Sequence, residues 1–185
     1  MNAIPTLYDG HQFRSKLEAR WAVFFNELEV KYEYEPEAFR CADGSQYTPD
    51  FFLPDTFLRD KDSKGVYVEI KPDIFDSREY AEYLLRIASA LDGSNFVLLS
   101  GDPLHLVRYA YDKHYYAENK SEQIQPWWDN EMVLMFCEKC NILKVEFNEG
   151  NYFNCPVCGN DTWDHPIRKA ALVARKYRFV FNNKK

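Results

Sequence analysis

Residues 14–30 show the hydrophobic spacing of an α-helix that buries one face. Their large apolar residues recur three or four positions apart, at Leu17, Trp21, Phe24, Phe25 and Leu28. Ser15, followed three residues later by Glu18, is a typical helix start, in which each side chain satisfies a backbone N–H. The pattern therefore predicts a helix that begins after Ser15 and packs on a core.

Residues 31–35 and 63–71 alternate apolar and polar residues with the period of two that is typical of strands, and residues 47–53, which end before Pro54, predict a further strand between them. Residues 77–91 return to helical spacing and predict a second helix. Residues 95–101 are a short, nearly all-apolar run between turn residues, as expected for a central strand buried on both faces. The predicted order is helix, three strands, helix, strand.

The rest of the chain is less regular. Residues 104–116 fit either a strand or a helix, and residues 117–126 are polar and turn-rich, as in a connector. Residues 166–179 predict a closing helix with a basic face. We therefore expect a core domain over residues 1–126 and a C-terminal module over residues 127–185.

Composition supports a folded protein that is not embedded in a membrane. The chain has 185 residues, of which 46% are hydrophobic and 17% aromatic, enough for a substantial core. It has no apolar run of bilayer length, and its first residues lack the apolar stretch of a signal peptide. These features predict a soluble, cytoplasmic protein without membrane partners.

Charge is distributed unevenly along the chain. The net charge is −6, yet the last 20 residues contain seven basic residues and no acidic one, so the first 165 carry −13. The helical part of this tail holds the candidate nucleic-acid contacts Arg168, Lys169, Arg175, Lys176 and Arg178. Such a tail suits a polyanion held at one place, and it equally suits internal pairing with the acidic body.

The cysteines form two closely spaced pairs within residues 131–160, which we expect to be a separate unit. Cys137 and Cys140 are three positions apart, as are Cys155 and Cys158, and 14 residues lie between the pairs. This spacing predicts a zinc ribbon in which four thiolates enclose a structural Zn²⁺ and leave no open position for catalysis. A redox dithiol is the less suitable alternative.

Glu69 and Lys71 give the third predicted strand a charged side. Because successive strand residues point to opposite faces, both lie on the face away from Val68 and Ile70. One interpretation is a solvated edge strand protected by charge. The other is a metal site, and this short segment by itself does not decide between them.

A second acidic residue can be placed beside Glu69. If residues 47–53 and 63–71 pair antiparallel with Asp50 opposite Glu69, Leu53 falls opposite Val66 and residues 54–65 form the loop. Opposed side chains are roughly 5 Å apart at Cβ, close enough to share a cation. We prefer Asp50 to Asp55 because the latter requires the strand to continue through Pro54.

With Glu18 on the first helix, these residues make an ordered set. Glu18, Pro49-Asp50 and Glu69-Ile70-Lys71, carried in this order on the predicted elements, resemble the PD-(D/E)XK nuclease superfamily. The similarity covers roughly residues 10–100 and is greatest to the transposon-end and phage-encoded endonucleases. It departs from many relatives in having no glutamine within residues 77–91.

The resemblance implies an α/β restriction-endonuclease-like core with a mixed sheet, to which a zinc ribbon is attached. It also implies a catalytic set of Glu18, Asp50, Glu69 and Lys71. Asp50 and Glu69 would bind Mg²⁺ or Mn²⁺ directly, together with the carbonyl of Ile70, and Glu18 through water or at a second ion. Lys71 would orient or deprotonate the attacking water. Glu18 alone also fits a simple helix cap.

We therefore expect a metal-dependent nuclease that hydrolyses phosphodiester bonds in DNA, as an endonuclease rather than an exonuclease. The acidic body suggests that a protein partner delivers the substrate. The alternative is a catalytically silent adaptor of the same fold that binds nucleic acid or protein.

Overall fold

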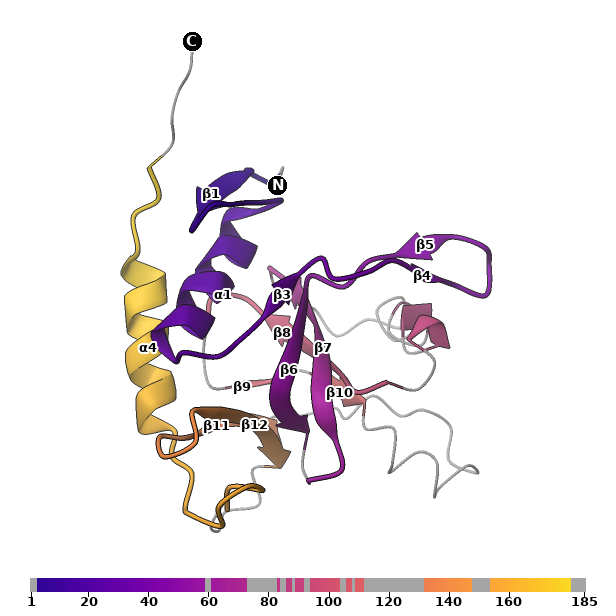
Figure 1. Cartoon of the computed structure of the whole chain (residues 1–185). Coiled ribbons are helices and arrows are strands. Elements are labelled where there is room, and N and C mark those ends of the chain that lie inside the picture. The colour runs from indigo at the N-terminus through magenta and orange to yellow at the C-terminus, as the bar shows by residue number, and fades with distance from the viewer. Residues whose placement is uncertain are drawn as a thin grey trace.

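The computed structural model describes residues 3–58, 61–72, 83, 86–87, 89–91, 94–103, 106–107, 109–111, 132–147 and 154–180. It is a mixed α/β fold in which two helices lie on one side of a mixed sheet (Figure 1). The helices are α1 (Lys16–Glu27) and α4 (His165–Lys176). The strands are β1 (Thr6–Tyr8), β2 (His11–Phe13), β3 (Glu33–Tyr34), β4 (Phe39–Arg40), β5 (Gln46–Tyr47), β6 (Phe51–Leu58), β7 (Lys64–Lys71), β8 (Phe96–Ser100), β9 (Leu106–Val107), β10 (Tyr109–Tyr111), β11 (Met132–Cys137) and β12 (Ile142–Phe147).

The main sheet has the order β10-β8-β7-β6-β12-β11-β9, with β3 paired to the first residues of β6. β6 and β7 are antiparallel, whereas β7 pairs parallel with β8 and β12 pairs parallel with β6. The mixed sheet confirms that part of the predicted fold class. β7 lies between two strands, so the interpretation of Glu69 and Lys71 as a charged edge is wrong.

The predicted register of β6 and β7 is confirmed, but the predicted loop between them is wrong. Leu53 lies opposite Val66, as expected. β6 nevertheless continues through Pro54 to Leu58, where the sequence analysis placed a loop. The pairing shifts between Leu53 and Phe57, and the irregularity accommodates Pro54, which cannot donate to a regular ladder.

Helix α1 begins as the sequence predicts. Ser15 is the N-cap, and its hydroxyl accepts a hydrogen bond from the backbone N–H of Glu18. The apolar face is fully enclosed: Trp21, Phe24 and Phe25 have no exposed surface. Because this face packs against Phe51, Val68 and other sheet residues in one continuous core, it fixes the N-terminus of α1 close to the start of β6.

Helix α4 packs beside α1 over the same face of the sheet (Figure 1). Small residues, among them Ala170, Ala171 and Ala174, form its buried side and allow the two helices to approach closely. This is the predicted closing helix. Its basic residues lie on the opposite, exposed side.

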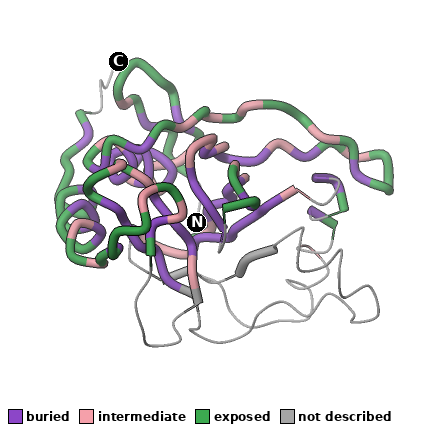
Figure 2. The backbone as a smooth tube through the Cα atoms, turned by 60° about the horizontal axis from the view of Figure 1, so that its bottom comes forward, coloured by how far each residue is buried: buried purple, intermediate pink, exposed green. Residues whose placement is uncertain are grey.

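The other face of the sheet has a smaller core. Tyr47, Ile87, Leu91, Phe96 and Leu98 are buried there together. Of the predicted second helix, the structure describes residues 83, 86, 87, 89 and 90, all of which are helical. Residues 77–82, where this helix was expected to begin, lie outside the described part. Figure 2 shows the buried strands passing between the more exposed surface segments.

The cysteine hairpin is continuous with the main sheet. β11 and β12 pair along their whole length, and β12 also pairs with β6 through Lys144 opposite Phe57 and Val145 opposite Leu58. This part of the structure therefore does not form the detached unit expected from residues 131–160. The expected boundary at residue 126, like Trp127 and Trp128, lies outside the described residues, so the two-domain division stays a prediction.

The ambiguous segment 104–116 contributes strands where it is described, as β9 and β10. Across the described residues, no helix combines the length and apolar character needed to cross a bilayer.

Candidate functional site

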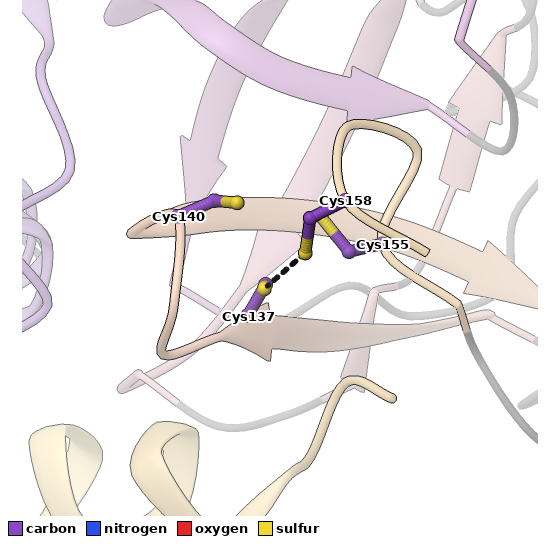
Figure 3. A group of neighbouring side chains, drawn as sticks. All are labelled: Cys137, Cys140, Cys155 and Cys158. Carbon is purple, nitrogen blue, oxygen red and sulfur yellow. Dashed lines mark hydrogen bonds between the residues drawn. The ribbon is translucent and has the colours of Figure 1, made fainter. Parts of the chain in front are cut away.

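The four paired cysteines converge. Cys137 ends β11, Cys140 lies in the turn that follows, and Cys155 and Cys158 lie in a second turn that faces the first (Figure 3). Their sulfur atoms all lie within 4.8 Å of one another. The Sγ atoms of Cys137 and Cys158 are 3.7 Å apart. Two ligands on a tetrahedral zinc, each about 2.3 Å from the metal, are about 3.8 Å apart, so this spacing fits a zinc ion.

Backbone hydrogen bonds prepare this group for metal binding. The N–H of Cys140 donates to the carbonyl of Cys137, and the N–H of Gly159 donates to the carbonyl of Cys155, closing the two turns. The backbone N–H of Asn160 lowers the pKa of Cys158 to about 7. Cys140, which hydrogen-bonds with Cys158, has a pKa raised to about 12. The cluster could therefore hold a metal such as zinc, and binding would release protons.

The predicted acidic residues occupy a second group, where the starts of α1 and β6 meet the end of β7. Glu18 lies in the first turn of α1, Asp50 immediately precedes β6, and Glu69 lies near the end of β7. Their exposed fractions are 8%, 4% and 4%. Acidic residues are rarely buried to this extent without a compensating partner, so each requires an explanation.

Both oxygens of Asp50 are engaged. The backbone N–H of Ile70 donates to Oδ2 at 2.7 Å, which ties the start of β6 to β7. The guanidinium of Arg14 donates to Oδ1 at 2.5 Å. Even so, burial, followed by the charges of Glu69 and Glu18, raises the pKa of Asp50 to about 7. The charges of Glu69 and Glu18 are thus close enough to disfavour the ionisation of Asp50.

Glu69 is held by two tyrosine hydroxyls and an amine. Tyr47 donates to Oε2 and Tyr83 donates to Oε1, each at 2.8 Å. Lys71 also donates to Oε1, and its ammonium lies 5.3 Å from the centre of the Tyr83 ring. Burial, followed by the charge of Glu69, raises the pKa values of both tyrosines, so they remain protonated donors at neutral pH.

Glu18 is both a cap residue and a member of this group. Its Oε1 accepts a hydrogen bond from Ser15 at 2.7 Å, and its Oε2 accepts one from Tyr34 at 2.7 Å. Arg14 lies 4.0 Å from the same Oε2. Glu18 therefore contacts the N-cap residue through the hydroxyl of Ser15, and it also lies within the acidic group.

The donor set suits a hard divalent ion, although these oxygens do not converge as closely as the thiols. Among the described residues, the four cysteines are the one group of three or more potential ligands drawn tightly together. Mg²⁺ commonly uses one or two carboxylates and keeps several waters, so Asp50 and Glu69 meet its usual requirement. A cation there would also offset the burial and the neighbouring negative charges that together raise the pKa of Asp50.

Four residues at this site were not singled out from the sequence as site residues. They are Arg14, Tyr34, Tyr47 and Tyr83. The helical spacing of residues 77–91 places Tyr83 on the apolar face of the second helix, and its hydroxyl donates to Glu69. The sequence offers one indication of these residues: a buried acidic residue needs hydrogen-bond donors, and tyrosines are abundant on the neighbouring elements.

The predicted nucleic-acid contacts on and after α4 divide into two groups. Arg168 pairs with Asp164 at 2.5 Å, and Arg175 lies 3.9 Å from Asp102. Lys169, Lys176 and Arg178 are exposed, and none forms an ion pair with another described residue. Internal pairing therefore accounts for part of the basic charge.

No family model, curated protein or solved structure matches the chain.

Proposed function

We propose that the chain is a metal-dependent nuclease of the PD-(D/E)XK type that hydrolyses phosphodiester bonds in DNA. The observation that carries the proposal is that Asp50, immediately before β6, lies beside Glu69 on the adjacent strand β7, with Lys71 on the same face as Glu69. The order α1, β6, β7, helical segment and β8 agrees with the core that the sequence resemblance implies.

Burial of these acidic residues is costly, which supports a role beyond stability. A buried acid whose pKa is raised to about 7 destabilises the folded protein at neutral pH. A residue selected only for stability would more easily be neutral at that position. Sites in which burial and like charges perturb ionisation are often functional.

In the proposed mechanism, Asp50 and Glu69 would hold Mg²⁺ or Mn²⁺, and the ion would neutralise phosphate charge and supply a nucleophilic water. Glu18 adds negative charge on the side of α1. Tyr47 and Tyr83 fix the carboxylate of Glu69 through their hydroxyls. Lys71 donates to Glu69 and can instead donate to a water or to a phosphate oxygen as charge develops.

The four-thiolate site would hold zinc at a structural position of the same sheet. Because β12 pairs directly with β6, zinc bound at the ends of β11 and β12 stabilises the strand that Asp50 precedes. The metal therefore contributes to the site through the framework, with all four cysteines as ligands and no position left for substrate.

One observation favours the adaptor alternative. Both oxygens of Asp50 and both oxygens of Glu69 already have donors within the protein. A fully satisfied polar group can serve stability without catalysis. The two functions differ in whether a divalent ion replaces some of these donors.

Cleavage by the purified, zinc-loaded chain tests the proposal. Supercoiled plasmid, linear duplex, branched DNA and single strands would be incubated with Mg²⁺ or Mn²⁺, then with the ion omitted and restored. Omission is a cleaner control than chelation because a chelator also removes zinc. Cleavage that requires the ion and disappears in Asp50→Asn supports the proposal. Binding of DNA without ion-dependent cleavage of any of these substrates supports the adaptor.

A further inference from the structure

Arg14 occupies a distinctive position at the acidic site. It lies between β2 and α1, and its backbone N–H donates to the hydroxyl of Tyr34 at 2.9 Å. The backbone is therefore anchored, while the side chain is 53% exposed. An anchored backbone with a half-exposed guanidinium allows the charged group to move without disturbing the fold.

The guanidinium joins acidic residues from three different segments. Its Nη2 contacts Oδ1 of Asp50 at 2.5 Å, and its Nε contacts Oε1 of Glu35 at 2.7 Å. The same Nε lies 4.0 Å from Oε2 of Glu18. One cation thus offsets the mutual repulsion of several carboxylates, which is also the electrostatic effect of a divalent ion at such a site.

Arg14 and a divalent ion would compete for one oxygen. Oδ2 of Asp50 is held by the backbone N–H of Ile70, an interaction that also links β6 to β7. Oδ1 is the oxygen that can be exchanged without breaking the sheet, and it is the one that Arg14 contacts. An ion at Oδ1 would repel the guanidinium, since two cations would then share one carboxylate.

A displaced guanidinium would remain beside the site. Glu35 is 37% exposed and still contacts Nε, so it limits how far Arg14 can move. Planar guanidinium groups bind phosphate through two parallel hydrogen bonds, and a lysine cannot reproduce that geometry. The released side chain is therefore suited to a phosphate oxygen of a nucleic-acid strand.

We propose that Arg14 is an exchangeable cation, which balances Asp50 until a divalent ion binds there and then turns to a phosphate of the substrate. This inference rests on the proposed nuclease function, because it requires both an ion at Asp50 and a phosphodiester nearby. It predicts opposite effects of one substitution: stronger binding of the ion and weaker binding of the strand.

Titration of Mn²⁺ into the full, zinc-loaded chain tests the first effect, with free Mn²⁺ followed by electron paramagnetic resonance. Arg14→Gln should bind Mn²⁺ about tenfold more tightly than the wild type, because a competing cation is removed. Lys31→Gln is the matched control. It removes one positive charge from a side chain that is 80% exposed and pairs with Asp55, and it should leave the affinity unchanged.

Binding of a short fluorescent DNA duplex in Ca²⁺, followed by anisotropy, tests the second effect. Arg14→Gln should weaken binding about tenfold. Arg14→Lys should restore near-normal Mn²⁺ affinity, since it keeps the charge, but only part of the DNA affinity. Thermal melting of each variant verifies folding, and Arg14→Lys preserves the test if Arg14→Gln unfolds.

The outcomes separate the two proposals. If an Asp50→Asn/Glu69→Gln double variant binds Mn²⁺ as the wild type does, these two residues do not form an ion site and the nuclease proposal fails. Protein that binds Mn²⁺ at these residues and cleaves DNA, but whose Arg14→Gln variant matches Lys31→Gln in both titrations, overturns only the role of Arg14.

Discussion

The thiol group and the carboxylate group use opposite ways of bringing potential metal ligands together. The four cysteines lie on two tight turns, and their sulfur atoms contact one another. The three acidic residues come from segments far apart in the sequence, and an arginine, a lysine and several tyrosines lie among them. The first group could hold one metal ion, and we propose that the second exchanges its partners.

The difference has a physical basis. Thiols are neutral until a metal binds unless their pKa is lowered, as it is at Cys158, so a group of four can be held together at little electrostatic cost. Carboxylates are ordinarily charged at neutral pH, and bringing them together is costly: burial, followed by the charges of Glu69 and Glu18, raises the pKa of Asp50. A site for a weakly bound catalytic ion therefore needs internal cations and hydroxyl donors that hold the acidic residues in its absence.

Removing a zinc ligand is expected to have the largest effect. Structural zinc in small domains contributes an apparent 10–16 kcal/mol or so of binding free energy at neutral pH. Cys155→Ser should therefore lose the zinc, and the strands β11 and β12 should become protease-sensitive. Metal analysis by mass spectrometry of protein purified without added zinc verifies the first point. Cys41, a buried cysteine outside the cluster, provides the control through Cys41→Ser.

The prediction of a structural zinc is wrong if wild-type protein contains clearly less than one zinc per chain while β11 and β12 resist proteolysis. A zinc content equal in Cys155→Ser and Cys41→Ser would also contradict it.

Loss of a carboxylate ligand is expected to abolish activity while leaving the fold intact. Asp50→Asn and Glu69→Gln should each reduce the rate of DNA cleavage at saturating Mg²⁺ by about 10²-fold or more, because each removes a direct ligand of the proposed ion. Zinc content and circular dichroism should be unchanged. Asp55 lies in β6 and pairs with Lys31 and Lys64. The control variant Asp55→Asn should therefore retain full activity. Cleavage that survives both site substitutions would show that the activity belongs to another site.

For both groups, the sequence predicted the course of the backbone better than the side-chain contacts. The register that sets Leu53 opposite Val66 follows from alternation, because slipping by one residue would turn every apolar side chain to the wrong face. The spacing of Cys137 and Cys140 likewise specifies a tight turn through local geometry. Both are short-range properties of the chain.

The missed features depend on contacts between distant segments. Nothing near Val145 indicates that β12 pairs with Leu58 of β6, since parallel pairing leaves no local turn signal. The continuation of β6 through Pro54 depends on an irregularity in its pairing with β7. Arg14 and Tyr83 look like an ordinary surface base and an ordinary core aromatic until the fold places them beside Asp50 and Glu69.

The stability of the chain should depend on pH in a direction set by Asp50. Its pKa is about 7 in the folded protein, against about 3.8 for an unperturbed aspartate. Between these values the folded state binds a proton that the unfolded state has released, so the free energy of unfolding falls as pH rises from about 4 to 7. In the wild type we expect the free energy of unfolding to fall by an amount on the order of 2 kcal/mol as pH rises, and we expect this fall to be absent in Asp50→Asn. Urea unfolding of zinc-loaded protein at pH 5 and pH 7.5, without other divalent ions, measures it.

Asp55→Asn is again the matched control. Hydrogen bonding to Lys64 lowers the pKa of Asp55, so this acid stabilises the folded protein above its unfolded pKa. In Asp55→Asn the free energy of unfolding should therefore still fall as pH rises. Mg²⁺ added at pH 7.5 should recover part of the stability in wild type but not in Asp50→Asn. If the free energy of unfolding depends on pH equally in wild type and Asp50→Asn, burial of Asp50 does not destabilise the folded protein at neutral pH.

The smallest expected effect concerns the basic residues of the C-terminal segment, where the structure separates paired from unpaired charges. Lys176 and Arg178 are exposed and form no ion pair with another described residue, whereas Arg168 pairs with Asp164 and Arg175 lies near Asp102. Each phosphate contact releases counterions and adds roughly 0.9 to the slope of log affinity against log salt. Lys176→Gln/Arg178→Gln should therefore reduce that slope by about 2, while Arg168→Gln/Arg175→Gln, which removes the same charge, should reduce it less. Anisotropy titrations of a short duplex over a range of salt concentrations distinguish the pairs. Equal slopes in both double variants and the wild type would mean that the nucleic acid binds away from α4 and that the segment's charge serves the protein's own acidic surface.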